Sequence, residues 1–104
     1  MIKVIEKYDE VEKIINKDLV MVIAKSHTCN SCSTIANILN NNLVHFDMID
    51  KYNIFVDDID QFRGEYLIFS VPTVLIFSEG KELLRQSRYF DYAKIDRLIE
   101  MFTS

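Results

Sequence analysis

Two cysteines are the residues of this chain best suited to chemistry. Cys29 and Cys32 are its only cysteines, and they are separated by Asn30 and Ser31. A disulfide between them would close too small a loop to restrain the unfolded chain much. Two thiols one helical turn apart suit reversible thiol–disulfide exchange, because the second thiol can attack a mixed disulfide formed on the first. The spacing therefore favours a redox-active pair over a structural cross-link.

The predicted position of the pair gives each thiol a role. The motif sits between a buried strand and a helix, so we expect Cys29 at the helix N-terminus, where free N–H groups and the helix dipole stabilise a thiolate. Cys29 is therefore predicted to be the nucleophile and Cys32 the resolving thiol. The competing interpretation is a pair of incidental buried cysteines that pack as small apolar residues.

Two basic residues near the pair are candidate modulators of its reactivity. His27 lies two positions before Cys29 and could, as a cation, lower the pKa of that thiol. An exposed loop histidine without a role is an equal alternative. Lys25 could act in the same way from the end of the preceding strand, although a solvated lysine is the simpler interpretation. His45 is interpreted as a partly buried, hydrogen-bonded residue within a strand.

The elements that must position these residues follow from the pattern of apolar side chains, at strand or helical spacing. The predicted strands cover residues 1–5, 19–24, 43–50, 74–77 and 82–88, and the predicted helices cover residues 8–15, 32–42, 53–63 and the segment after Asp91, its predicted cap. The run 19–24 is apolar throughout, which indicates a central strand. Gly80 in the turn 78–80 predicts a hairpin between the last two strands. The order βαβαβαββα predicts an α/β layer structure with a mixed sheet.

Length and composition limit the class of protein. A chain of 104 residues with 49% apolar residues can form one domain, residues 1–104, without a disulfide framework or a structural metal. Its net charge of −4 comes from mixed signs without a Lys/Arg block, so nucleic acid and membrane surfaces are not expected as partners. Acidic residues near the N-terminus interrupt any secretory signal, and no run is long enough to cross a bilayer. We therefore expect a cytoplasmic monomer.

A second motif gives the cysteine pair its context. Pro72 is the only proline and stands in Ser70-Val71-Pro72-Thr73, directly before a predicted strand. Alone, it could simply begin that strand with a trans peptide bond. A strand, a cysteine pair opening a helix, and then Val-Pro-Thr before a hairpin and a last helix together resemble the thioredoxin superfamily over nearly the whole chain.

The resemblance implies a thioredoxin-like fold with a central mixed sheet flanked by helices. It also implies that Pro72 is cis and faces the cysteine pair, and that Val71 and Pro72 form a platform whose backbone binds an extended substrate peptide. The implied substrates are proteins that contain disulfides. Electrons would come from a separate thiol or flavoprotein reductase, and no bound cofactor is implied.

The chain also departs from the superfamily pattern. Thr28-Cys29-Asn30-Ser31-Cys32 stands where Trp-Cys-Gly-Pro-Cys is usual, and the chain has no tryptophan. Ile23 replaces a buried aspartate six positions before the first cysteine, and the partner lysine on the third strand falls near Phe46. A glycine that follows the last strand is replaced near Arg88. These departures predict altered proton handling and altered docking.

The leading interpretation is a thiol–disulfide oxidoreductase that reduces protein disulfides, with Cys29 attacking and Cys32 resolving. One alternative is an adaptor of the same fold that binds a partner without turnover, which the altered dipeptide and Ile23 favour. The other is a zinc-binding module that uses both cysteines with His27 and His45, although it lacks a second cysteine pair.

Overall fold

A computed structural model describes residues 2–103 of the chain. Its elements are β1 (Lys3–Ile5), α1 (Asp9–Ile15), β2 (Val20–Lys25), the 3₁₀ turn η1 (Asn30–Ser33), α2 (Ile35–Asn42), the 3₁₀ turn η2 (Phe46–Met48), β3 (Asp50–Phe55), α3 (Asp60–Glu65), β4 (Thr73–Ser78), β5 (Lys81–Gln86) and α4 (Tyr92–Thr103). The predicted order of helices and strands is confirmed, with the two 3₁₀ turns added.

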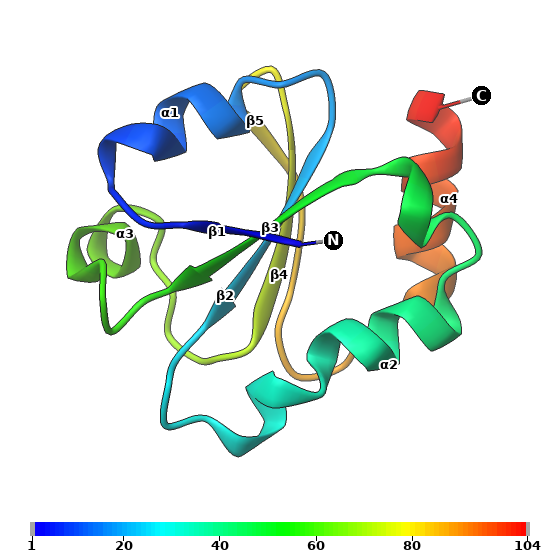
Figure 1. The fold of residues 1–104 in the computed structure, drawn as a ribbon. Coiled ribbons are helices and arrows are strands. Elements are labelled where there is room, and N and C mark those ends of the chain that lie inside the picture. Colours follow the sequence, from blue (N-terminus) through cyan, green and yellow to red (C-terminus); the bar gives the residue numbers. More distant parts are fainter. Residues whose placement is uncertain (1, 104) are drawn as a thin grey trace.

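The five strands form one mixed sheet in the order β1-β3-β2-β4-β5. Strands β1, β3 and β2 are parallel, and β4 and β5 continue the sheet as antiparallel neighbours. Helices α1 and α3 cover one face of the sheet and α2 and α4 cover the other (Figure 1). The predicted α/β architecture, with a mixed sheet between two layers of helices, is therefore confirmed.

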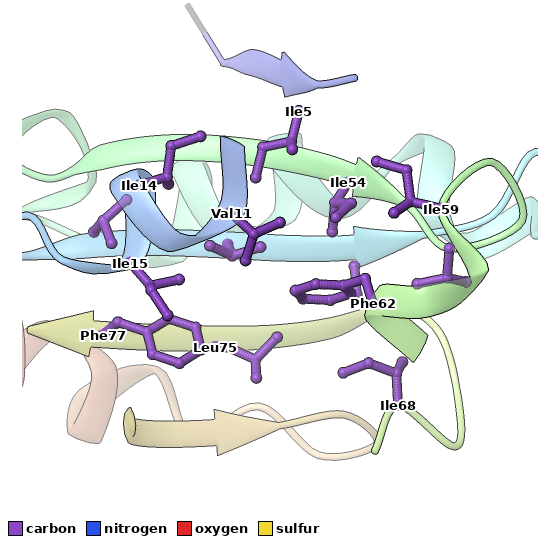
Figure 2. Packing of buried hydrophobic residues seen from close by; sticks show 14 residues of the cluster. Ile5, Val11, Ile14, Ile15, Ile54, Ile59, Phe62, Ile68, Leu75 and Phe77 are labelled. Carbon is purple, nitrogen blue, oxygen red and sulfur yellow. The ribbon is translucent and has the colours of Figure 1, made fainter. Parts of the chain in front are cut away.

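Strand β2 lies at the centre of the sheet and contributes to both core layers. Its residues from Val20 to Ala24 are all buried, as the continuous apolar run predicts. Val22 joins the layer beneath α1 and α3, and its neighbour Ile23 joins the layer beneath α2 and α4. Figure 2 shows the first of these layers, in which Val11 of α1 and Phe62 of α3 lie over the sheet.

The prediction of a strand over residues 43–50 was wrong. Strand β3 begins at Asp50, and the preceding residues form a loop and the turn η2. The backbone N–H groups of Val44 and His45 each donate to the carboxylate of Asp96 on α4, at 2.9 Å. A side chain far along the sequence thus takes the donors that a strand would use in a ladder. His45 consequently precedes η2 instead of interrupting a strand.

The predicted helix over residues 53–63 was also misplaced at its start. Asn53 pairs in register with Ile23, and Phe55 pairs with Lys25, so both belong to β3. Helix α3 begins only at Asp60 and ends at Glu65, close to the predicted end at Gly64. Burial between β1 and β2 in the sheet outweighs the local helical pattern of these residues.

The hairpin and the final helix agree with their sequence signals. Gly80 has a φ of +84° in the turn between β4 and β5, and its N–H donates to the carbonyl of Ile15 at 2.8 Å. A side chain there would also meet the Asn16 side chain, so glycine suits this turn. Asp91 caps α4 by accepting a hydrogen bond from the N–H of Lys94 at 3.1 Å.

Among residues 2–103, no helix combines the length and the apolar character needed to cross a lipid bilayer.

Candidate active site

Cys29 and Cys32 are joined by a disulfide at the end of the sheet where β2 finishes. Their Cα atoms lie 5.3 Å apart. The N–H of Cys32 donates to the carbonyl of Cys29 at 3.2 Å, which closes the 3₁₀ turn that carries the pair. Cys29 is half-buried, whereas Cys32 is only 1% exposed. Cys29 is therefore the cysteine that another molecule can reach.

The structure corrects the position of this pair relative to the helix. The cysteines occupy η1 and its first flanking residue, and α2 begins only at Ile35. The side-chain hydroxyl of Ser33 donates to the carbonyl of Asn30 at 2.9 Å, and that of Thr34 donates to the carbonyl of Ser31 at 3.2 Å. These bonds compete with the α-helical pattern and delay its start. The dipole of α2 therefore begins farther from Cys29 than the sequence predicts.

Val71 is brought directly to Cys29 by the loop before β4. Its carbonyl oxygen lies 3.7 Å from the Sγ atom of Cys29. The peptide bond between Val71 and Pro72 is cis, and Pro72 is buried. The hydroxyl of Thr73 donates to the carbonyl of Ser70 at 2.6 Å and fixes the end of this loop.

His27 is engaged by acidic residues from the loop after β3. Its Nε2 atom lies 2.8 Å from a carboxylate oxygen of Asp58, and its backbone N–H donates to Asp57 at 3.0 Å. The imidazole also stacks on the ring of Phe55, with 4.1 Å between the ring centroids. The hydrogen bond to Asp58 raises the pKa of His27 above its ordinary value. The carboxylate thus stabilises the cationic histidine near the cysteine pair.

Lys25 lines the same site as His27. It is the last residue of β2, and both side chains line a hollow of about 200 Å³ together with Cys29, Cys32 and Phe55. Its Nζ atom is 5.9 Å from the centroid of the Phe55 ring. Partial burial lowers the pKa of the Lys25 ammonium group from its usual value.

No protein-family model matches the chain. The thioredoxin-like protein YdfQ of Bacillus subtilis (strain 168) is 28% identical over 72 residues, which are 69% of this chain and 64% of that protein. The chain thus matches less than two thirds of the length of this relative.

Solved structures match the whole fold. The thioredoxin of Malassezia sympodialis aligns with a TM-score of 0.80 at 21% identity, covering 100% of this chain and 92% of that one. The oxidised thioredoxin of Plasmodium falciparum aligns with a TM-score of 0.79 at 21% identity, covering 100% of both chains. The chain has the thioredoxin fold. A thioredoxin fold with a Cys-X-X-Cys pair at disulfide distance supports thiol–disulfide chemistry in general.

The thioredoxin fold places Ile23 in the core beneath α2 and α4. Ile23 is fully buried and pairs in register with Asn53 of β3 and Val74 of β4. The amide oxygen of Asn53 is buried and has no hydrogen-bond partner among residues 2–103. The apolar side chain expected at position 23 is therefore confirmed as a core residue that leaves its polar neighbour unsatisfied.

The expected place of the third-strand lysine was wrong because the strand itself was misplaced. Phe46 lies on η2, and the lysine of β3 is Lys51, which pairs with Met21. The ammonium group of Lys51 donates to the carbonyls of Phe46 and Ile49, at 2.7 and 2.9 Å. These two carbonyls hold Lys51 at the start of β3, two positions before the residue that pairs with Ile23.

The four residues of the zinc hypothesis are not assembled in the described part of the chain. His45 lies between Asp96 and Glu100 of α4, at 3.0 and 3.5 Å, and both cysteine sulfurs are bonded to each other. The hydrogen bond to Asp96 confirms the interpretation of His45 as a partly buried, satisfied residue. Within residues 2–103, His27, Asp57 and Asp58 alone bring three ligand atoms within 4.8 Å of one another, and all three residues are exposed.

Asp57 and Asp58 are the site residues that sequence reasoning missed. Both fall near the start of the helix predicted over residues 53–63, where acidic residues are favoured. In the structure they follow β3, which runs parallel to β2, so they meet the loop that follows β2 at the same edge of the sheet. A sequence analysis that ended β3 at Phe55 would have placed both acidic residues in the loop beside His27.

Proposed function

We propose that this protein is a thiol–disulfide oxidoreductase that reduces disulfides in other proteins. The observation that carries this proposal is the pairing of an accessible Cys29 with a buried Cys32 in a disulfide beside the carbonyl of Val71. An accessible sulfur can attack a substrate, and a buried sulfur can complete the exchange from within.

The reaction begins with both cysteines as thiols. The thiolate of Cys29 attacks one sulfur of the substrate disulfide, so that a mixed disulfide forms and the other substrate sulfur leaves as a thiolate that takes up a proton. The Cys32 thiol then loses its proton and attacks Cys29. This step forms the Cys29–Cys32 disulfide and releases the second substrate thiol, so two electrons and two protons have passed to the substrate.

Val71 and Pro72 are proposed as the platform for the substrate peptide. The carbonyl of Val71 lies next to Cys29, so a backbone N–H of an extended peptide bound there would bring the substrate disulfide to the Sγ atom. Pairing through the backbone recognises peptides with little regard to their side chains. This suits an enzyme that acts on several protein disulfides.

Lys25 and His27 are proposed as modulators of the two sulfurs. Lys25 shares a hollow with both cysteines, and His27 carries a positive charge favoured by Asp58. Positive charge near a sulfur favours its thiolate. Both side chains line the hollow, but the charge of His27 is paired with the carboxylate of Asp58, so Lys25 is the stronger of the two candidates.

The remaining parts of the proposal concern the surroundings of the reaction. Electrons are expected from a separate thiol or flavoprotein reductase, since the exchange consumes one pair of thiols per turnover. A cytoplasmic location fits this cycle, because the thiol pools of the cytosol keep such pairs reduced. The protein is proposed to act as a monomer without nucleic acid or membrane.

The test is reduction of insulin disulfides in the presence of dithiothreitol. We expect the wild-type protein to accelerate precipitation of the insulin B chain, and Cys29→Ser to abolish the acceleration. Asn30→Ala is a matched control, because it changes an exposed residue of the same turn and leaves both thiols in place, whereas the hydroxyl of Ser31 lies 3.4 Å from the Sγ atom of Cys29. Binding of disulfide-containing proteins without any acceleration would instead favour the adaptor, the alternative supported by the altered dipeptide and Ile23.

A further inference from the structure

Arg85 reaches from the edge of the sheet to the loop that leads to Val71. It lies on β5, the last strand of the sheet order. Its guanidinium donates to the carbonyl of Tyr66 at 2.7 Å and to the carbonyl of Leu67 at 2.9 Å. Both carbonyls belong to the start of the segment that joins α3 to β4, which we call the platform loop, residues 66–72.

Glu82 fixes the orientation of this guanidinium. Its two carboxylate oxygens accept hydrogen bonds from the Nη2 and Nε atoms of Arg85, at 2.8 and 3.0 Å. Such a two-point pair holds the planar group in one orientation, which a lysine could not reproduce. The Arg85 side chain is only 33% exposed although it lies on an edge strand. Four hydrogen bonds therefore fix the guanidinium in place, unlike a solvent-exposed ion pair, which is free to move.

The start of the platform loop needs such a contact. Tyr66 is the C-cap residue of α3, and the terminal carbonyls of a helix have no partners within it. Leu67 has a φ of +54°, a left-handed conformation that costs energy for a residue with a branched side chain. Arg85 donates hydrogen bonds to the carbonyls of both residues. It thereby stabilises a turn that the local sequence does not favour.

Further contacts fix the rest of the platform loop between Arg85 and Cys29. Ile68 is buried in the core layer beneath α1 and α3 (Figure 2), and its N–H donates to the carbonyl of Arg63 at 3.0 Å. At the end of the loop next to β4, the hydroxyl of Thr73 donates a hydrogen bond to the carbonyl of Ser70. The loop is thus held at both ends, with Val71 placed between the anchors and Cys29.

We propose that Arg85, oriented by Glu82, is a positioning residue for the substrate platform. The inference rests on the proposed function, because it assigns Arg85 a role in binding protein substrates. Without Arg85 the turn at Leu67 loses its partner, and the carbonyl of Val71 is held less firmly opposite Cys29. Peptides that bind through that carbonyl lose affinity, whereas a small disulfide that reacts without the platform does not.

The test compares two substrates in variants of the pair. Arg85→Gln is expected to raise KM for insulin by about tenfold, since a small displacement of a binding group costs this much or more. The rate at which this variant reduces the small disulfide 5,5′-dithiobis(2-nitrobenzoate) should be unchanged. Arg85→Lys should give an intermediate KM, and Glu82→Gln should shift KM in the same direction as Arg85→Gln. Arg97→Gln is the control, because Arg97 is an exposed arginine on α4.

Amide hydrogen exchange gives a readout that does not depend on activity. In Arg85→Gln, the amides of residues 68–71 should exchange faster, while the amides of β2 keep their protection. Equal losses with both substrates, or unchanged exchange at residues 68–71, would overturn the inference. If the wild-type protein reduces no disulfide but exchange in the loop rises as expected, the proposed function fails while the anchoring by Arg85 stands.

Discussion

The carbonyl oxygen of Val71 lies 3.7 Å from the Sγ atom of Cys29, although the two residues are 42 positions apart. The contact joins the loop before β4 to the turn after β2, and these strands are antiparallel neighbours at the centre of the sheet. The topology therefore places a reactive sulfur and a backbone acceptor together at one edge of the sheet. A peptide bound to this acceptor would present its disulfide to Cys29.

The difference in burial between the two cysteines predicts different rates of alkylation. After reduction, Cys29 should react with iodoacetamide faster than Cys32, because Cys29 is half-buried and Cys32 is 1% exposed. Mass mapping of the peptides after a brief pulse at neutral pH measures the ratio. Equal labelling, or faster labelling of Cys32, would contradict the assignment of the nucleophile.

The assigned roles also predict which variant traps substrates. Cys32→Ser keeps the attacking thiol and loses the resolving thiol, so it should accumulate mixed disulfides with protein substrates. Cys29→Ser should not, because the remaining thiol is buried. Non-reducing gels followed by mass spectrometry of the trapped species distinguish the two variants. Trapping to the same extent by both would show that the roles are wrong.

The ion pair between His27 and Asp58 predicts a stability difference that depends on pH. Because the pKa of His27 is raised in the folded state above its ordinary value of about 6.5, the pair contributes fully below that value. The contribution is lost as pH rises through the higher folded pKa. Asp58→Asn should therefore lower Tm more at about pH 5.5 than at about pH 8.5, on either side of the reference histidine pKa.

A second variant, at Asp57, distinguishes the effect of the His27–Asp58 ion pair from that of the neighbouring backbone hydrogen bond. Asp57 is bonded to the backbone N–H of His27 instead of its ring, and this bond lowers the pKa of the Asp57 carboxyl. Asp57 also acts on the His27 charge, but without a bond to the ring, so Asp57→Asn should show a smaller difference in Tm between these two pH values. A loss of Tm in Asp58→Asn that is identical at both pH values would exclude the charged pair as its cause.

Local sequence signals were sufficient for much of the fold. The apolar run from Val20 to Ala24 identified the central strand, and Asp91 and Gly80 marked a helix start and a turn correctly. These elements depend on burial or on residues within a few positions. The redox-active cysteine pair likewise follows from its spacing together with the Val-Pro-Thr motif.

Features that depend on residues far apart in the sequence could not be predicted from local sequence patterns. Residues 43–49 resemble a strand, but Asp96, about fifty positions later, accepts the N–H groups of Val44 and His45. The misplaced strand then concealed the contact of His27 with Asp58. Arg85 was similarly inconspicuous, because its partners lie 18 and 19 positions earlier. Each of these contacts follows from the topology of the sheet, which short sequence patterns do not specify.

Ile23 leads to a prediction about the second step of the exchange. Attack by Cys32 requires loss of its proton, and the fully buried Ile23 offers no group that could accept it. The burial of Cys32 also favours the neutral thiol. Mixed disulfides on Cys29 should therefore be long-lived near neutral pH and should resolve faster as pH rises above 7, toward the reference thiol pKa of about 8.5.

Installing an acid tests this explanation directly. Ile23→Asp should shorten the lifetime of the mixed disulfide, because a carboxylate can take the proton of Cys32. Position 23 pairs with Asn53, whose buried amide oxygen has no hydrogen-bond partner in the described part of the chain, so the protonated acid could donate to that oxygen. Replacing packed isoleucine should still lower the free energy of unfolding by roughly 2–5 kcal/mol.

Ile23→Asn is the matched control, because asparagine has nearly the shape of aspartate and cannot accept the proton. It should lose comparable stability without faster resolution, and rapid-quench measurement of the mixed-disulfide lifetime against pH compares the three proteins. A wild-type protein that resolves quickly, with no pH dependence between about pH 6 and 9, would contradict the role assigned to Ile23. Lys25 would then be the group to test, since it shares the hollow with Cys32 and burial lowers the pKa of its ammonium group. In that case Lys25→Met, and not Ile23→Asp, should change the lifetime.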